Sequence, residues 1–280
     1  MSKLKILEDG GLSIEYRCVK CRDCADCRNA EETEKISLRE EAEMHMIRES
    51  VRLDLPNKKI ICSLPLRGPE QDFLTTNRDR TLQILDQQCR KYQKDDEIKV
   101  VAVKAFSKLL DNGHAILMDD LDEETKGQFI HKDPQYFIPW RLVFKTDSLS
   151  TPCRVVLDGS SRTKFRPNGL AGRCLNDLVV KGKITTINLV KLVLRFRAGK
   201  FGVTCDLKQF YNSCKLLPNQ WNLQRFLYRK DMNPNNPVLE GAIMTLIYGV
   251  KSVSAQSEHA IKLLADLVSC LLYTSDAADE

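Results

Sequence analysis

The chain has 280 residues, of which 42% are hydrophobic and 29% are charged, and its 43 Lys+Arg against 38 Asp+Glu give a net charge of +5. This composition excludes a disordered or collagen-like chain, because there is enough apolar side chain to form a core, and the length suits two domains better than one. Apolar runs fall short of the ~18 residues that a membrane span needs, and the first residues, MSKLKILEDGG, lack a signal peptide's apolar run, so an intracellular, soluble protein without membrane contact is expected.

Charge is divided unevenly along the chain. Residues 1–130 carry 22 Lys+Arg against 26 Asp+Glu, whereas residues 131–269 carry 21 against 9, and residues 270–280 add three acidic residues. A basic half of this kind favours nucleic acid or another polyanion as partner, because phosphate neutralisation by Lys and Arg dominates such binding. A solvated basic surface without such a partner is the alternative.

The N-terminal segment, residues 1–36, is rich in cysteine. Eleven cysteines in a chain without an export signal favour reduced thiols or metal ligands over a disulfide framework. Four of them form an unbroken CxxCxxCxxC run: Cys18, Cys21, Cys24 and Cys27. Four thiolates at this spacing can converge on one tetrahedral Zn²⁺, although the run is tighter than the usual two separated pairs. A metal-free segment and an iron–sulfur site are the alternatives, the latter disfavoured because the bacterial cluster run ends CxxxCP and Arg28 follows here.

Residues 37–130 have the pattern of a mostly helical connector domain. Ser37 and Glu40 form a capping box at the start of a helix expected over residues 37–53. The further elements expected here are a short strand within residues 58–66 and helices over residues 78–92 and 96–110, the last ended by Asn112-Gly113.

Met118-Asp119-Asp120 looks like the paired aspartates of a polymerase. The acidic run continues through Asp122, Glu123 and Glu124, however, so an exposed acidic turn is expected.

From Gln135 the pattern changes to short apolar runs separated by turn residues, which is typical of strands. Strands mixed irregularly with helices indicate an α+β fold rather than regular βαβ alternation. The strand candidates lie within residues 136–145, 153–161, 201–211, 224–231 and 242–249, and the helix candidates span Thr185 to Phe196 and Ser252 to Val268.

The sharpest local signal is VTCDLKQFY, residues 203–211. A carboxylate at the end of an apolar strand is costly unless it binds a cation or accepts hydrogen bonds. Asp206 is therefore a candidate metal ligand, since two-metal phosphoryl transfer needs a strand-borne carboxylate. A structural aspartate at a strand end is the alternative.

Residues 135–269 contain four segments that together resemble a known family. They read PQYFIPWRLVFKTDSLSTPCRVVLDGSSRT, CLNDLVVKGK, LRFRAGKFGVTCDLKQFYNSCKL and LIYGVKSVSAQSEHAI, and in this order they are similar to the reverse transcriptase of BEL/Pao-type LTR retrotransposons. ICSLPLRGPEQDFLTTNRDR and FSKLLDNGHAI resemble the region between protease and polymerase in such Pol polyproteins. The resemblance implies the fingers and part of the palm of a right-hand polymerase over residues 131–269. It also implies an RNA-directed DNA polymerase that uses Mg²⁺, deoxynucleoside triphosphates and an RNA or DNA template–primer.

The resemblance implies roles for individual residues. Asp206 matches the first palm aspartate, a ligand of both Mg²⁺ ions, with the carbonyl of Leu207 as a further ligand. Tyr211 matches the steric gate that rejects a 2′-hydroxyl, and Phe210 beside it belongs to the same nucleotide-binding set.

Further nucleotide contacts are implied in the fingers and before the palm helix. Arg154 matches the arginine that stacks on the base and contacts the triphosphate, and Lys145 takes about the place of the lysine that reaches the γ-phosphate. Gly249 matches the glycine before the palm helix, with Lys251 beside it. Residues 250–253, VKSV, depart from the small or proline residues that the family usually has there.

The tail, residues 270–280, reads CLLYTSDAADE and resembles a translated sequencing adapter. The natural sequence is then expected to be interrupted near Ser269, before the family's Asp-Asp hairpin, so the chain is expected to be an inactive fragment. The family implies protease, RNase H and integrase as the other parts of the Pol polyprotein, and cytoplasmic virus-like particles as the location. The alternative is a non-catalytic, Cys-rich nucleic-acid-binding or assembly module derived from such an element.

Overall fold

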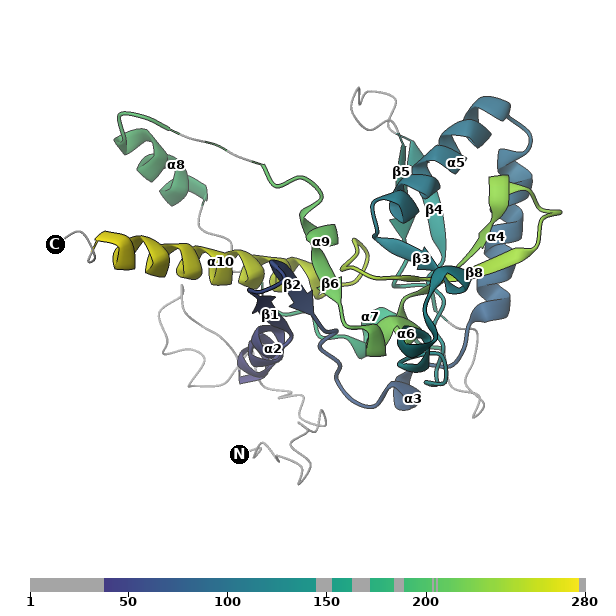
Figure 1. The fold of residues 1–280 in the computed structure, drawn as a ribbon, viewed down its shortest axis with the longest axis horizontal. Helices are drawn as coiled ribbons and strands as arrows, with labels where there is room; N and C mark the ends of the chain where they lie inside the picture. The colour runs from purple at the N-terminus through teal and green to yellow at the C-terminus, as the bar shows by residue number, and fades with distance from the viewer. Residues whose placement is uncertain are drawn as a thin grey trace, which may run out of the picture.

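The computed structural model describes residues 38–144, 153–162, 172–183, 189–202, 204 and 206–276. These residues form a mixture of helices and mainly antiparallel strands, which agrees with the expected α+β class (Figure 1). The cysteine run at Cys18, Cys21, Cys24 and Cys27 and the candidate Lys145 lie outside the described residues.

The first described helix is shorter than the sequence pattern predicts. Helix α2 (Leu38–Glu49) ends before Ser50, and the strand β1 (Val51–Asp54) takes the place of its expected last turn. The β1 strand pairs antiparallel with β2 (Lys59–Cys62), which lies within the expected strand. Val51 is buried, so pairing with β2 and burial of this apolar side chain outweigh helix continuation.

The two long helices of this region are confirmed. Helix α4 (Arg78–Tyr92) and helix α5 (Asp96–Asp111) start where predicted, and α5 ends one residue later than predicted. The Asp95 side chain accepts a hydrogen bond from the Ile98 N–H and so caps α5. Gly113, at φ +63°, continues the chain after α5, as the Asn-Gly signal predicts.

Two three-stranded sheets connect the parts of the chain before and after residue 130. In one, β2 pairs with β6 (Cys214–Leu216), giving the order β1-β2-β6. In the other, β3 (Ala115–Leu117) pairs with β8 (Val238–Ile243), which pairs with β7 (Arg225–Arg229). The described residues on both sides of residue 130 therefore share sheets and one hydrophobic core.

A separate ribbon of two strands completes the sheet structure. Strand β4 (Trp140–Phe144) pairs antiparallel with β5 (Cys153–Leu157). The remaining helical elements are α3 (Glu70–Phe73), η1 (Met118–Asp120), α6 (Glu123–Gly127), α7 (Leu175–Leu178), α8 (Leu189–Ala198), α9 (Phe210–Ser213), η2 (Pro218–Leu223), η3 (Lys230–Met232) and α10 (Val253–Asp276).

Two predicted strands differ in the structure. Of the candidate within residues 242–249, only the first two residues lie in a strand, because β8 ends at Ile243. The candidate within residues 201–211 differs more. Where described, residues 201–209 belong to no strand, and α9 follows them at Phe210. Phe201 is 83% exposed and Leu207 is 53% exposed, so the apolar run is not covered as a core strand would be. The strand of this region starts later, at Cys214, where the backbone pairs with β2.

The acidic turn at η1 is confirmed. Met118 is buried, whereas Asp119 and Asp120 are exposed. The two carboxylates therefore face solvent, and only the methionine contributes to the core.

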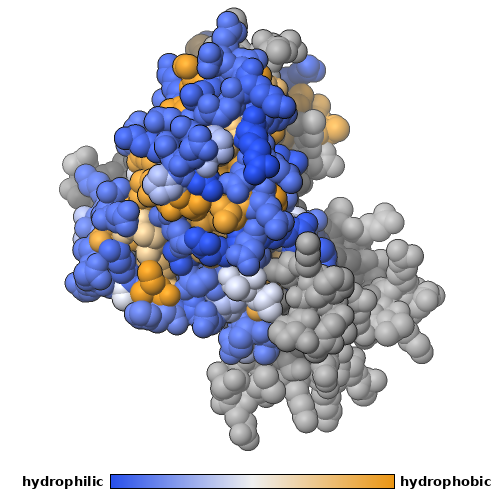
Figure 2. All heavy atoms as spheres, turned by 90° about the vertical axis from the view of Figure 1, so that its right-hand side faces the viewer, coloured by the Kyte–Doolittle hydropathy of each residue, from blue (hydrophilic) through white to orange (hydrophobic). Residues whose placement is uncertain are grey.

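Figure 1 shows α4, α5, β4, β5, β7 and β8 on one side of the molecule and α2, β1 and α10 on the other, with β6 and α9 between them. The face in Figure 2 is mainly hydrophilic, with small apolar areas between polar ones. Many of the exposed large apolar side chains lie on α8 and α10, among them Leu194, Phe196, Ile261, Leu264 and Val268. Over the described residues, no helix is both long and apolar enough to cross a bilayer.

Candidate functional site

The candidate site lies at the turn before α10. Gly249 has φ +111°, a conformation that favours glycine, and Tyr248 beside it is 66% exposed. The residues on either side, Ile247 and Val250, are buried, so the turn is anchored in the core at both ends.

The end of β5 lies directly against this turn. A β-carbon at Gly249 would lie 2.1 Å from the carbonyl oxygen of Leu157, the last residue of β5. A β-carbon at Gly159 would lie 2.7 Å from the carbonyl oxygen of Gly249. Side chains at either glycine would therefore collide with backbone atoms, which explains why two glycines meet here.

Asn176 in α7 joins the turn to the residues after β5. Its Nδ2 donates to the Gly249 carbonyl oxygen and to the Ser160 Oγ, both at 2.7 Å, and its Oδ1 accepts from the Lys251 N–H at 2.9 Å. Neither the sequence pattern nor the family resemblance predicts a role for Asn176. The one sequence feature that pointed to this region was the CLNDL segment, which contains Asn176 and is part of the family resemblance.

Aromatic side chains cover one side of the turn. The ring centroids of Tyr211 and Tyr248 are 4.3 Å apart, and the two rings are inclined at 51°. The ring centroid of Phe210 lies 6.3 Å from that of Tyr211. The Tyr211 hydroxyl lies 3.5 Å from the Ser254 Oγ at the start of α10. Tyr211 is half-buried and Tyr248 is exposed, so together they offer an aromatic surface with a polar edge.

Lys251 lies on a half-buried part of the site. Burial lowers the pKa of its ammonium, and the nearby Arg67 guanidinium lowers it further, while Glu43 and Asp177 oppose this effect. Arg67 and Glu43 form an ion pair at 3.0 Å. Lys251 is thus a cation among fixed charges of both signs.

Asp206 and Leu207, the candidate metal ligands, are both exposed and lie on a segment without strand structure. In the described part of the chain, no group of three or more His, Cys, Asp or Glu side chains is placed so that it could share a metal ion. Asp206 therefore supplies one carboxylate, and the described residues do not by themselves form a two-metal site.

Arg154 lies on β5 opposite Val143 of β4 and is exposed. The strand that carries it ends at Leu157 against the Gly249 turn. The structure thus brings this strand, Tyr211 and Gly249 to one region, although they are far apart in the sequence.

The segment that carries Asp206 is held by a contact with the turn after α5 that the sequence did not indicate. His114 Nε2 lies 3.2 Å from the Gln209 Oε1, and Gln209 has φ +51°. The Lys215 ammonium donates to the Gly113 carbonyl at 2.9 Å. The turn after α5 therefore supports the loop between Asp206 and Tyr211.

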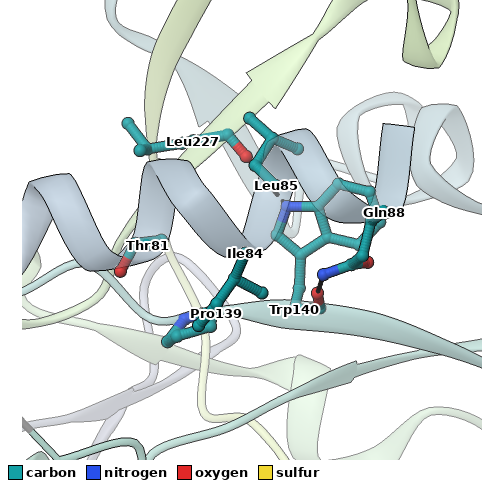
Figure 3. Close-up of a pocket in the computed structure, with 7 residues that line it drawn as sticks. All are labelled: Thr81, Ile84, Leu85, Gln88, Pro139, Trp140 and Leu227. Atoms are coloured by element: carbon teal, nitrogen blue, oxygen red, sulfur yellow. Dashed lines mark hydrogen bonds between the residues drawn. The ribbon is translucent and has the colours of Figure 1, made fainter. Parts of the chain in front are cut away.

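A small space away from the Gly249 turn lies between α4 and the strands β4 and β7. Figure 3 shows its lining, in which Trp140 donates through Nε1 to the Leu227 carbonyl at 2.8 Å and Gln88 donates to the Trp140 carbonyl. This space has no room for a water molecule. It is a packing contact of the core and offers no ligand site.

The chain matches no protein-family model and no curated protein sequence.

Proposed function

We propose that the chain carries part of the nucleotide site of an RNA-directed DNA polymerase of the BEL/Pao retrotransposon type. The observation that carries the proposal is the contact between Tyr211 and Tyr248, whose ring centroids are 4.3 Å apart. The resemblance assigns both Tyr211 and the neighbouring Gly249 to the nucleotide site. Their proximity is what such a site requires.

Convergence of the other similar segments supports the same proposal. The end of β5, the Asn176 side chain, Tyr211 and the Gly249 turn each come from a different one of the four segments that resemble the family. A chance similarity in sequence gives no reason for all four to meet at one turn.

The proposed roles follow from the chemistry of the side chains. The ring of Tyr211 would occupy the space that a ribose 2′-hydroxyl needs, and Phe210 would support it. Arg154 would contact the base and triphosphate, since a planar and permanently charged guanidinium suits both tasks. Lys251 would add positive charge beside the phosphates.

Asp206 would bind Mg²⁺, with the Leu207 carbonyl as a further ligand. Two-metal nucleotidyl transfer requires more carboxylate oxygens than one aspartate offers. The described residues do not provide them, so the proposed polymerase needs carboxylates from elsewhere, and no chemical step is assigned to this chain alone. Template–primer and the other parts of a Pol polyprotein are the partners that the proposal implies, and virus-like particles in the cytoplasm are its implied location.

A non-catalytic nucleic-acid-binding or assembly module of the same origin is the second candidate. The exposed position of Asp206, without a carboxylate cluster among the described residues, favours it. Such a module would bind nucleic acid through its basic surface but would not distinguish one nucleoside triphosphate from another.

Competition between deoxyribonucleotides and ribonucleotides separates the two candidates. Fluorescently labelled dATP is titrated with the chain in the presence of Mg²⁺, and unlabelled dATP or ATP competes with it. The polymerase proposal expects dATP to compete better than ATP, and Tyr211→Ala to remove the difference. Arg154→Ala should weaken both competitors alike, whereas Arg141→Ala, an exposed arginine on the neighbouring strand β4, should have little effect. Equal competition by dATP and ATP in the unaltered chain would favour the non-catalytic module.

A further inference from the structure

The buried ends of the Gly249 turn, Ile247 and Val250, are joined by one long backbone hydrogen bond, from the Val250 N–H to the Ile247 carbonyl at 3.4 Å. Gly249 is exposed and has φ +111°, and the side chain of Tyr248 is largely exposed as well. Glycine has more backbone freedom than any other residue, so contacts from outside the turn contribute to fixing its conformation at this position.

The side chain of Asn176 supplies these contacts on both sides of the glycine. It donates to the Gly249 carbonyl oxygen at 2.7 Å and accepts from the Lys251 N–H at 2.9 Å. These two hydrogen bonds to the Asn176 side-chain amide fix the orientation of the peptide groups that carry the Gly249 carbonyl and the Lys251 N–H, just before α10. The remaining Nδ2 hydrogen is used by the Ser160 Oγ at 2.7 Å, so both donors of the side-chain amide are satisfied.

Asn176 itself is held in place by the short helix α7. Its backbone N–H donates to the Gly159 carbonyl at 3.0 Å. The neighbouring Asp177 accepts from the Cys174 N–H at 3.0 Å and forms an ion pair with Arg162 at 3.2 Å. Leu175 and Leu178 are fully buried, so the helix is anchored in the core on both sides of Asn176.

We infer that Asn176 is a positioning residue: it sets the conformation of the Gly249 turn and thereby the contact between Tyr248 and Tyr211. The link to nucleotide binding rests on the function proposed above, whereas the control of the turn rests on the hydrogen bonds alone. Asn176 acts through the turn and is not assigned a contact with the nucleotide.

Asn176→Ala removes all three side-chain bonds, while Ser160→Ala removes one bond and leaves both bonds to the turn. Asn236→Ala is the matched control, because Asn236 also donates to a backbone carbonyl, that of Lys230 at 2.8 Å, in the loop between β7 and β8. Backbone amide exchange with deuterium, read for residues 248–252, reports the turn directly. Asn176→Ala should speed exchange of the Lys251 amide about tenfold or more, and the two other variants should change it less than about twofold.

The affinity for labelled dATP with Mg²⁺ is the second measurement. Asn176→Ala should weaken this affinity about tenfold, because a displaced Gly249 turn no longer holds its residues in the orientation that nucleotide binding requires. Amide exchange in α4 and α5 should stay unchanged. Unchanged exchange at residues 248–252 in Asn176→Ala would overturn the control of the turn. Faster exchange with unaltered dATP affinity would overturn the positioning role. If the unaltered chain binds no triphosphate, the proposed function fails, and the exchange rates still decide whether Asn176 controls the turn.

Discussion

A β-carbon at Gly249 would lie 2.1 Å from the carbonyl oxygen of Leu157, so the backbone of Leu157 occupies the space that a side chain at position 249 would need. Gly249→Ala must move either β5 or the turn, and it must also hold alanine at φ +111°. We expect it to lower the free energy of unfolding by about 2–4 kcal/mol.

Urea unfolding measures this change, and two other glycines serve as controls in the same experiment. Gly113 has φ +63° with open space around it, so Gly113→Ala should cost about 1–2 kcal/mol from backbone strain alone. Gly127 has open space and no positive φ, so Gly127→Ala should be neutral or stabilising by about 0.5 kcal/mol. An equal cost for Gly113→Ala and Gly249→Ala would show that the contact with Leu157 contributes nothing.

Gln256 connects α10 to the sheet that contains β1 and β2. It is fully buried, donates to the Ser50 Oγ at 2.9 Å and to the Ser63 carbonyl at 2.8 Å, and accepts from the Ser252 Oγ at 2.9 Å. Gln256→Leu leaves these partners without their bonds in the interior. We expect the free energy of unfolding to fall by about 2–4 kcal/mol.

The exposed Gln128 provides the comparison for that substitution, since Gln128→Leu should change the free energy of unfolding by less than about 0.5 kcal/mol. Ser252→Ala, which removes one bond of the network, should lie between the two. A cost for Gln256→Leu as small as that for Gln128→Leu would mean that the network does not hold α10.

The stability of the chain should depend on pH through His114. Burial lowers the pKa of its imidazole below the ordinary 6.5, and the Lys215 ammonium lowers it further, against the hydrogen bond with Gln209. The Nδ1 atom is buried without a hydrogen-bond partner, so protonation there would bury an unsatisfied N–H. The unfolded chain therefore binds a proton more readily than the folded chain, and stability is lost as the pH falls below about 6.5.

Free energies of unfolding at pH 7.5 and pH 5.5 measure this effect. The unaltered chain should be less stable at the lower pH, and His114→Gln should lose less stability over the same interval. His259, whose pKa is also lowered by burial and by Arg48, should contribute in the same direction, so adding His259→Gln should flatten the dependence further. An equal loss in His114→Gln and in the unaltered chain would exclude His114 as a source.

Local sequence signals predicted the parts of the fold that local interactions determine. Helix α5 has its stop signal in Asn112-Gly113 and is capped by Asp95, and both α4 and α5 lie where the sequence places them. The early end of α2 was not predictable in this way, because β1 exists only through its pairing with β2. The absence of strand structure at Asp206 has the same origin, since an apolar run becomes a strand only if a neighbour pairs with it.

The sequence named two residues that the structure brings close to the Gly249 turn, but it did not indicate what supports that turn. Tyr211 and Gly249 came from the resemblance, and the structure brings their segments together. Asn176 and His114 act through contacts between segments far apart in the chain, and an asparagine in a short helix carries no local sign of the carbonyl that it will bind. Contacts of this kind depend on how distant segments come together in three dimensions, and local sequence patterns do not predict them.

The cysteine run lies outside the described residues, and its zinc content can be tested independently of them. If Cys18, Cys21, Cys24 and Cys27 bind zinc as thiolates, the purified chain should contain about one equivalent of the metal by elemental analysis. The double variant Cys18→Ser/Cys24→Ser should lose it, and Cys153→Ser on β5 should retain it. A folded chain without metal would exclude the zinc site.

The last prediction is that the chain by itself does not extend a primer. Asp206 supplies one carboxylate, and the described residues contain no cluster that could complete the coordination of two ions. Incomplete coordination removes the clamp on the attacking and leaving oxygens together, so activity should be at background rather than merely reduced. Primer extension with template, deoxynucleotides and Mg²⁺ is measured beside Asp206→Asn, which should give the same background rate. Extension above that of Asp206→Asn would mean that Asp206 has the further ligands it needs, while equal extension by both chains above a protein-free control would transfer the catalytic role elsewhere, with the exposed Asp119 and Asp120 as the first residues to substitute.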